Sequence, residues 1–393
     1  AVLSRSDSSS PNGKEQVKDL NTLPPPDYDD YFRELATLKG AGGIQVVLPV
    51  EASRGCWWGR CSFCNLNLQW KGYRWKKPQR VASEIDFLSR RYSAIDFAFM
   101  DNCLPRRSAH EIFEQLCLHK RDYSIFAELR AVHSKKEMAT MRRGGLRTVQ
   151  IGIEALSSRV LKKLRKGSTA IQNLAAMKNC AETGIDLQSN LITCFPGTTR
   201  EEVEETLENL DFAWPFAPLK PVKFWLGMES PAYLEQEEFG IRFVRPDRKY
   251  KMLFPAEVAE ALVPLILEYS GDRTRQEGLW RPVEKKLAYF IEQRKKLGIR
   301  ASALTYRDGG DFLLIKQVLP EGQVLNHRLS GPSRKLYLAA DEPVSFEQLF
   351  DVVPEIPYEK KEAFLRQMAA KRLIFLEEGK ALALACKDSC NLW

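Results

Sequence analysis

Residues 148–164 read TVQIGIEALSSRVLKKL, and this stretch sets the pattern on which the fold prediction rests. Its first part, Thr148–Ile153, is a short apolar run with β-branched residues, which is typical of a buried strand. In its second part, Ser157–Leu164, the apolar residues are spaced as in an amphipathic helix. A strand followed by a helix in this way is one βα unit of a parallel sheet.

The same unit recurs along much of the chain. The predicted strands are Ile44–Val50, Ile95–Met100, Ser124–Arg130, Thr148–Ile153, Leu187–Thr193 and Val222–Gly227. The predicted helices between them are Gln79–Arg91, Ala109–His119, Lys135–Arg142, Ser157–Leu164, Thr169–Glu182 and Arg200–Ala213. This alternation predicts an α/β fold with a parallel sheet. Six units favour a partial (β/α)6 barrel over a full eight-fold one, with an open doubly wound sheet as the alternative.

Composition divides the chain into four predicted parts. Residues 1–40 are polar, with serine-rich and proline-rich stretches, and we interpret them as a linker that ends a further N-terminal domain. Residues 41–230 contain the βα units, and residues 231–310 are expected to form a helical connection. Residues 311–393 are predicted to include two helices followed by a β-hairpin, which indicates a small winged-helix-like domain.

The overall composition is that of an ordinary globular protein, with 44% apolar residues and a net charge of +8 over 393 residues. No run reaches the roughly 20 apolar residues that a membrane span needs, and no signal peptide opens the chain. We therefore expect a cytoplasmic protein that does not enter a membrane. The basic residues form no dense stripe with interleaved aromatics, so nucleic acid is not the expected partner.

Three cysteines stand close together in residues 54–65, RGCWWGRCSFCN. Cys56, Cys61 and Cys64 can wrap one metal centre in this glycine-containing loop. A closed structural site needs a fourth protein ligand, and the first histidine of the chain is His110. The favoured interpretation is an iron–sulfur cluster with one open iron. A zinc site completed by a distant ligand and three buried cysteines without metal are the alternatives.

Polar residues stand at or near the ends of several predicted strands. Because the C-terminal ends of parallel strands meet at one mouth, we expect these residues to share a site with the cysteines. The alternative roles are helix caps and structural ion pairs. The residues are Asp101 and Asn102 after the second strand, Glu128 and Arg130 at the third, Glu154 at the fourth and Asn190 at the fifth.

Several segments around the cysteines carry a resemblance to a known family. They are Glu51–Gly59, Tyr73-Arg74, Asp101-Asn102, Gly152–Ser157, Arg165–Gly167 and Phe195–Gly197. With the C-x4-C-x2-C spacing and the aromatic residue before the last Cys, they resemble the radical S-adenosylmethionine (SAM) superfamily. The first gap is one residue longer than the common spacing of that superfamily. Over about residues 20–385 the chain is similar to the members that mature ribosomally made, post-translationally modified peptides (RiPPs). Many of those are cobalamin-dependent C-methyltransferases, and peptide epimerases are close relatives.

The resemblance implies cofactors and a site. It implies a [4Fe-4S] cluster on Cys56, Cys61 and Cys64, with SAM bound at the open iron and cleaved reductively. For an epimerase, the resemblance offers Cys103 and Cys194 as hydrogen donors. It assigns contacts with SAM to Phe63, Asp101, Asn102, Arg130, Glu154, Asn190 and Gly197.

The function that the resemblance implies is C-methylation of an unactivated carbon in a ribosomally made peptide. Cobalamin would come from an N-terminal domain, the electron from a flavodoxin or ferredoxin, and the leader of the precursor peptide would bind the C-terminal domain. Two alternatives stay open. The first is a peptide epimerase without cobalamin, and the second is a zinc-stapled nucleic-acid-binding protein.

Overall fold

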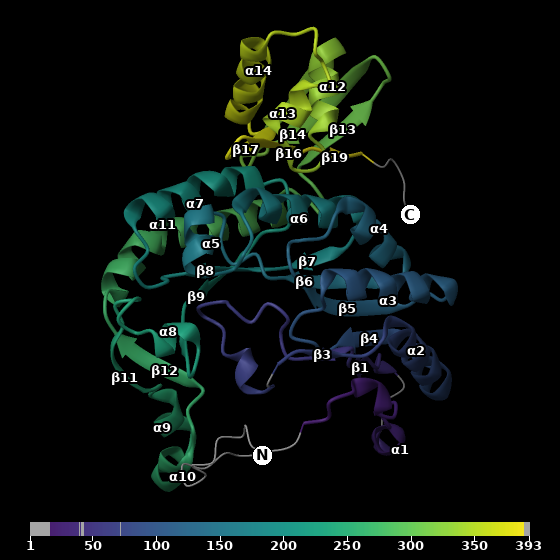
Figure 1. Cartoon of the computed structure of the whole chain (residues 1–393), viewed down its shortest axis with the longest axis vertical. Coiled ribbons are helices and arrows are strands. Elements are labelled where there is room, and N and C mark those ends of the chain that lie inside the picture. The colour runs from purple at the N-terminus through teal and green to yellow at the C-terminus, as the bar shows by residue number, and fades with distance from the viewer. Residues whose placement is uncertain (1–15, 39, 41–42, 71, 389–393) are drawn as a thin grey trace.

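The computed structural model describes residues 16–38, 40, 43–70 and 72–388 of the chain. Its centre is a five-stranded sheet in the order β1-β4-β5-β6-β7, and every neighbouring pair is parallel (Figure 1). The predicted α/β fold with a parallel sheet is therefore confirmed. The strands are β1 (Leu48–Val50), β4 (Asp96–Phe99), β5 (Ser124–Leu129), β6 (Leu146–Ile151) and β7 (Asp186–Gln188).

Helices follow the strands and cover the outer side of the sheet (Figure 1). Three of them begin at a capping box, in which a Ser or Thr side chain and a Glu or Gln three residues later satisfy the first backbone N–H groups. Helix α6 is the most deeply packed, with ten buried residues. The helices are α2 (Pro78–Tyr92), α3 (Arg106–Leu118), α4 (Lys135–Arg143), α5 (Ser158–Lys163), α6 (Ala170–Thr183) and α7 (Arg200–Ala213).

The parallel arrangement continues beyond β7 through a change of partner. Strand β8 (Asn190–Thr193) pairs in parallel with β9 (Lys220–Lys223), and a parallel bridge joins Leu191 to Glu154. The predicted strand 187–193 is thus two strands, because the pairing partner changes from β6 to β9 at Ser189. The hydroxyl of Ser189 donates to the carbonyl of Ile151 at 2.7 Å. The predicted strand 222–227 is likewise divided between β9 and β10 (Leu226–Gly227). The description as a partial barrel stays a prediction.

Residues 231–310, expected to be a helical connection, also contain strands. β11 (Arg242–Pro246) and β12 (Ile266–Ser270) form an antiparallel sheet with β10 in the order β10-β12-β11. The expectation was incomplete because β11 is mostly exposed and lacks an alternating apolar pattern. The long helix α11 packs against α7. The helices of this part are α8 (Pro231–Leu234), α9 (Lys249–Leu253), α10 (Ala256–Ala261) and α11 (Arg273–Lys296).

The C-terminal part contains two small sheets, in the orders β15-β14-β13-β19 and β16-β18-β17. Two helices, α13 and α14, precede the β17–β18 hairpin as the sequence predicted, while the winged-helix description stays a prediction. The strands are β13 (Leu304–Asp308), β14 (Phe312–Val318), β15 (Val324–Ser330), β16 (Val344–Ser345), β17 (Ile374–Glu377), β18 (Lys380–Ala383) and β19 (Cys386–Lys387). The helices are α12 (Gly331–Ala339), α13 (Phe346–Phe350) and α14 (Tyr358–Ala370).

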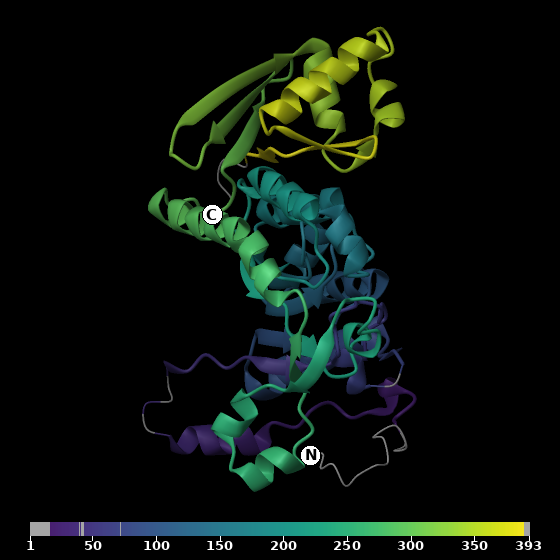
Figure 2. The same ribbon diagram turned by 90° about the vertical axis from the view of Figure 1, so that its left-hand side faces the viewer.

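This C-terminal part is held against the outer side of α6 and α4 (Figures 1 and 2). The fully buried Lys178 of α6 donates to the backbone carbonyl and to the carboxylate of Asp341, at 2.7 and 2.6 Å. Lys135 of α4 lies 3.0 Å from the same carboxylate. At the other end of α6, the backbone N–H of Ile171 donates to Glu377 at 2.9 Å. Buried polar contacts of this kind fix one orientation of the two parts.

Residues 1–40 are more than a linker where the structure describes them. Helix α1 (Asp29–Thr37) lies beside α2, with Asp29 in a bidentate contact with the guanidinium of Arg91. Residues 1–15, which include the serine-rich stretch, lie outside the described residues. Among the helices that the structure describes, none is both long and apolar enough to cross a bilayer.

Candidate active site

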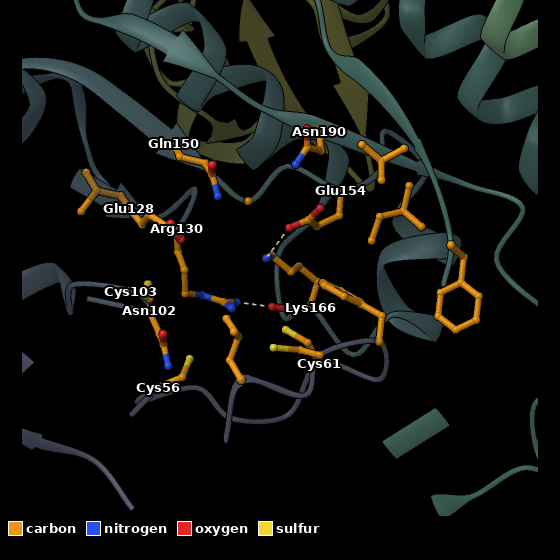
Figure 3. A pocket seen from close by; sticks show the side chains of 18 of the residues that line it. Cys56, Cys61, Asn102, Cys103, Glu128, Arg130, Gln150, Glu154, Lys166 and Asn190 are labelled. Carbon is orange, nitrogen blue, oxygen red and sulfur yellow. Dashed lines mark hydrogen bonds and ion pairs between the residues drawn. The ribbon is translucent and has the colours of Figure 1, made fainter. Parts of the chain in front are cut away.

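A cavity of about 260 Å³ lies where β5, β6, β8 and β9 end (Figure 3). Its wall combines thiols, charged groups and apolar side chains. The three cysteines of the trio are in the wall, and so are residues from the ends of four strands. The lining includes Cys56, Cys61, Cys64, Asn102, Cys103, Glu128, Arg130, Gln150, Glu154, Lys166, Asn190, Lys223 and Trp225.

The loop that carries the cysteines is fixed at both ends and in its middle. It starts and ends at a two-stranded ribbon of β2 (Ser53–Arg54) and β3 (Arg74–Trp75). Gly55 has φ +87°, and a Cβ there would collide with the backbone of Gly72, so the loop needs glycine at this position. In the middle, the backbone N–H of Ser62 donates to the carbonyl of Leu164 at 3.0 Å. The C-terminal end of α5 therefore positions Cys61 and Cys64.

Two tryptophans of the loop pack under a cation. The indole N–H of Trp58 donates to the carbonyl of Arg165 at 2.9 Å, and the ring fits against Gly167, where a Cβ would overlap it. The guanidinium carbon of Arg130 lies 4.3 Å from the centre of the Trp58 ring and 5.4 Å from that of Trp57. Such contacts hold a guanidinium in place while its edge stays available for hydrogen bonds.

The donor set fits an iron–sulfur cluster. Cys56, Cys61 and Cys64 are all free thiols that line one cavity, as the sequence predicted, and thiolates are the usual ligands of such clusters. Burial raises the pKa of the Cys64 thiol to about 11 and raises that of Cys61 as well. Within the described part of the chain, no three His, Cys, Asp or Glu side chains are arranged as ligands of a single metal ion.

Two buried donors in the cavity wall lack partners. Among the described residues, neither Nε of Arg130 nor Nδ2 of Asn102 has a hydrogen-bond partner, although both atoms are buried. Another nitrogen of the Arg130 guanidinium donates to the carbonyl of Lys166 (Figure 3). Buried donors are nearly always satisfied in native proteins, so these two call for an acceptor on a bound molecule. A carboxylate such as that of SAM meets the requirement.

An ion pair stands beside these donors. Nζ of Lys166 lies 3.1 Å from Oε1 of Glu154, and a Cβ on Gly152 would overlap the ammonium group. Although burial lowers the pKa of Lys166, the charge of Glu154 raises it above its usual value. Glu154 has φ +59° and its backbone bonds to Asn190 and Ile192, which joins the end of β6 to β8. Burial, with the charge of Glu154 nearby, raises the pKa of Glu128.

Most of the predicted site residues do meet at the cavity. Beyond the trio, Phe63, Asn102 and Cys103 line it. So do Arg130 just after β5, Glu154 beyond the end of β6, and Asn190 at the start of β8. Burial raises the pKa of the Cys103 thiol to about 12.

Three predicted residues do not line the cavity. Asp101 is only 2% exposed and turns toward β2, where it accepts from the backbone N–H of Ala52 at 3.1 Å and from the hydroxyl of Ser53 at 2.5 Å. Its carboxylate therefore does not line the cavity, and its predicted contact with SAM stays a prediction. Cys194 is buried in the hydrophobic core. The N–H of Gly197 donates to Asp272 and its carbonyl accepts from Lys163, at 3.1 and 2.6 Å.

The sequence prediction missed several lining residues. Lys166 comes from the turn after α5 and not from a strand end, so the strand-end rule could not find it. Gln150 and Gly152 alternate with apolar residues along β6 and just beyond it, and this period of two was the available signal. Lys223 and Trp225 flank the end of β9, whose bounds the sequence placed too late.

Comparison with known proteins finds a family model and several relatives that match part of this chain. Residues 50–210 match the family model described as the radical SAM superfamily. An uncharacterized methyltransferase of Pyrococcus horikoshii is 31% identical over 201 residues, which are 49% of this chain and 42% of that protein. An anaerobic magnesium-protoporphyrin IX monomethyl ester cyclase of Rubrivivax gelatinosus is 28% identical over 194 residues, or 44% of this chain and 34% of that protein.

The fold has a solved counterpart as well. The cobalamin-dependent S-adenosylmethionine radical enzyme OxsB, with aqua-cobalamin bound, superposes with a TM-score of 0.53 at 15% identity. The superposition covers 72% of this chain and 45% of that one. The match thus spans less than half the length of each of these three proteins.

Proposed function

We propose, from the match of residues 50–210 to the radical SAM superfamily model, that this chain is an enzyme that cleaves SAM reductively. In this proposal it methylates an unactivated carbon of a ribosomally made peptide, with cobalamin as the methyl carrier. One observation carries the proposal. The three thiols of a C-x4-C-x2-C loop line the same cavity as the unpaired buried donors of Arg130 and Asn102.

Each part of the cavity has a role in this proposal. Cys56, Cys61 and Cys64 would hold a [4Fe-4S] cluster, which supplies one electron to SAM so that a 5′-deoxyadenosyl radical can form. Arg130 and Asn102 would donate to the carboxylate of SAM, and Arg130 brings the opposite charge. The wall also contains Phe63, Leu129, Ile192 and Phe224, and these apolar side chains exclude water from a reactive radical.

The choice of methylation and of cobalamin rests on the relatives. The Pyrococcus protein is described as a methyltransferase and OxsB as cobalamin-dependent. The peptide substrate rests on the resemblance of the segments around the cysteines. We further propose that residues 311–393 bind the leader of the precursor peptide, that a flavodoxin or ferredoxin supplies the electron, and that the protein is cytoplasmic.

A second candidate function has one observation in its favour. Cys103 lines the cavity together with the trio, so its thiol faces the same space as a bound substrate carbon would. A peptide epimerase needs such a donor, because the carbon radical left by hydrogen abstraction must take a hydrogen atom on its other face. In that case Cys103→Ala would leave SAM cleavage intact and abolish inversion of the peptide.

The experiment that tests the proposal is anaerobic reconstitution with iron and sulfide, followed by metal analysis and an assay of SAM cleavage. We expect about four irons per chain, charge-transfer absorption, and 5′-deoxyadenosine after reduction. Cys64→Ala should lose both iron and cleavage. Cys117→Ala, which changes a half-buried cysteine of α3 outside the cavity, is the matched control and should retain both. Zinc without iron, or a cluster that never cleaves SAM, would contradict the proposal.

A further inference from the structure

One segment beside the cavity exposes large apolar side chains that the fold does not cover. This segment, called the arm, is residues 242–266 and contains β11, α9, α10 and the first residue of β12. Phe243, Met252 and Leu253 are 87%, 79% and 74% exposed. Neither α9 nor α10 contains a buried residue. Clusters of exposed apolar side chains of this kind mark interaction surfaces.

The first half of the arm is basic, whereas its second half adds two exposed carboxylates, Glu257 and Glu260. Between Arg242 and Lys251 the sequence has five basic residues and one acidic residue, Asp247. Glu268 neutralises two of the five, lying 2.8 Å from Arg245 and 3.9 Å from Arg248. Arg242, Lys249 and Lys251 form no ion pair with any described residue and are exposed. A partner with negative charges between apolar residues complements this surface.

The arm continues the wall of the cavity. Trp225 lines the cavity and is 43% exposed, and the chain passes directly from it into β10. β10 pairs with β12, and β12 pairs with β11, so one small sheet connects the cavity wall to the arm. A peptide does not fit as a whole into a cavity of about 260 Å³, so most of it lies outside the cavity when one of its residues enters. The C-terminal part lies at the opposite end of the molecule from α9 and α10 (Figure 1).

Recognition on the arm would use side chains. β11 is the outer strand of its sheet, and an open edge can accept an added strand. Here the pairing shifts between Arg242 and Arg245, and Pro246 ends the strand. A bulge, a proline and charged side chains are features that discourage pairing at an edge. Apolar anchors and cations are therefore the groups that the arm offers.

We propose that the arm binds an acidic segment of the peptide substrate, in which apolar residues alternate with carboxylates. Phe243, Met252 and Leu253 would take the apolar side chains, and Lys249 and Lys251 would pair with the carboxylates. The proposal rests on the proposed function in one respect, namely that the substrate is a peptide. It places this acidic segment at the arm, in addition to the leader that we assign to residues 311–393.

The test is a binding measurement on the full reconstituted chain. The probe is a labelled synthetic peptide in which glutamates alternate with leucines and phenylalanines. The control peptide has lysines in place of the glutamates. We expect fluorescence anisotropy to show tighter binding of the acidic peptide, weakening with salt. Lys249→Glu/Lys251→Glu should weaken it roughly tenfold. Met252→Ser/Leu253→Ser should weaken it at any salt concentration, since it removes the apolar anchors.

The matched control reverses two exposed lysines of α11, Lys285→Glu/Lys295→Glu, and should bind the acidic peptide like the unmodified chain. Equal binding of the two peptides would overturn the proposal. So would a loss of binding in the control alone. A dimer that Lys249→Glu/Lys251→Glu dissociates in sedimentation would overturn it as well, since the arm would then join two copies of the chain.

Failure of this proposal is distinguishable from failure of the proposed function. SAM cleavage without peptide should be the same in the unmodified chain and in Lys249→Glu/Lys251→Glu, because the arm lies outside the cavity. Absent cleavage in the unmodified chain would contradict the radical SAM activity and leave the peptide-binding result intact.

Discussion

Nζ of Lys166 lies 3.1 Å from a carboxylate oxygen of Glu154, and the two side chains are only 9% and 13% exposed. The pair joins two elements, since Lys166 follows α5 and Glu154 bridges the end of β6 to β8. It also places one charge of each sign in the wall of the cavity. Its contribution to stability and its contribution to binding can be measured separately.

Removal of either charge should destabilise the fold. Lys166→Met or Glu154→Leu leaves an unpaired charge in a nearly dry site, and we expect each to lower the free energy of unfolding by about 3 kcal/mol. The double variant should lose less than the sum of the two, as measured by urea denaturation. Arg107→Gln, which breaks an exposed pair with Glu111, is the control and should cost less than about 1 kcal/mol. Additive losses would contradict a direct coupling.

Arg130 should determine the affinity for SAM. Arg130→Lys keeps the positive charge but loses the forked guanidinium whose Nε has no partner among the described residues. We expect SAM to bind the reconstituted variant about tenfold more weakly, equivalent to about 1.4 kcal/mol, in calorimetric titration. Arg106→Lys alters an arginine that pairs with Glu137 outside the cavity and should leave the affinity unchanged. Unchanged binding by Arg130→Lys would refute the assignment.

Asp101 should make stability depend on pH. Burial raises the pKa of this carboxyl from 3.8 to about 6. Between these values the folded state holds a proton that the unfolded state has lost, so the free energy of unfolding falls as the pH rises. The fall that Asp101 causes is about 3 kcal/mol from about pH 4 to 7. In Asp101→Asn this contribution should vanish. Urea denaturation gives the free energy of unfolding at each pH. If this free energy changes with pH by the same amount in both proteins, the assignment is wrong.

Lys178 should anchor the C-terminal part. Its ammonium group is fully buried between α6 and Asp341, so Lys178→Met leaves the carboxylate of Asp341 with only Lys135 as a partner. We expect a loss of about 3 kcal/mol in the free energy of unfolding and faster proteolysis within residues 311–388. Lys135→Met, at a more exposed site, should cost less. Proteolysis at the original rate would mean that other contacts hold the C-terminal part.

The sequence predicted the helices and strands of the parallel core well, and it predicted the strands that follow the core poorly. The bounds of α7 (Arg200–Ala213) agree with the prediction because a capping box at Thr199 and Glu202 marks its start. The break at Ser189 was invisible, since it follows from a change of strand partner and not from local composition. β11 escaped for a similar reason, since it pairs with β12 beyond α9 and α10 and has no alternating apolar pattern of its own.

For the site as well, residues set by local pattern were predictable and residues set by long-range packing were not. The trio, Arg130 and Glu154 were predictable because strand ends converge in any parallel sheet. Asp101 does not line the cavity because its carboxylate accepts from Ala52 and Ser53, and the sequence does not show such long-range partners. Lys166 was missed because its position depends on how the turn after α5 packs against the cysteine loop.

Gly152 limits which residues can be combined at positions 152 and 166 during evolution. The volume that a methyl group on residue 152 would occupy is already filled by the ammonium group of Lys166 and bordered by Glu154. A descendant that gains a larger residue at 152 has to displace the ammonium group of Lys166 and the carboxylate of Glu154, or else shorten position 166. Positions 152 and 166 should therefore covary among homologous chains, with Gly paired to Lys and larger residues paired to shorter ones. A shorter residue at 166 also removes the ammonium group. In such a homologue, the carboxylate of Glu154 would line the cavity without the partner that Lys166 provides here.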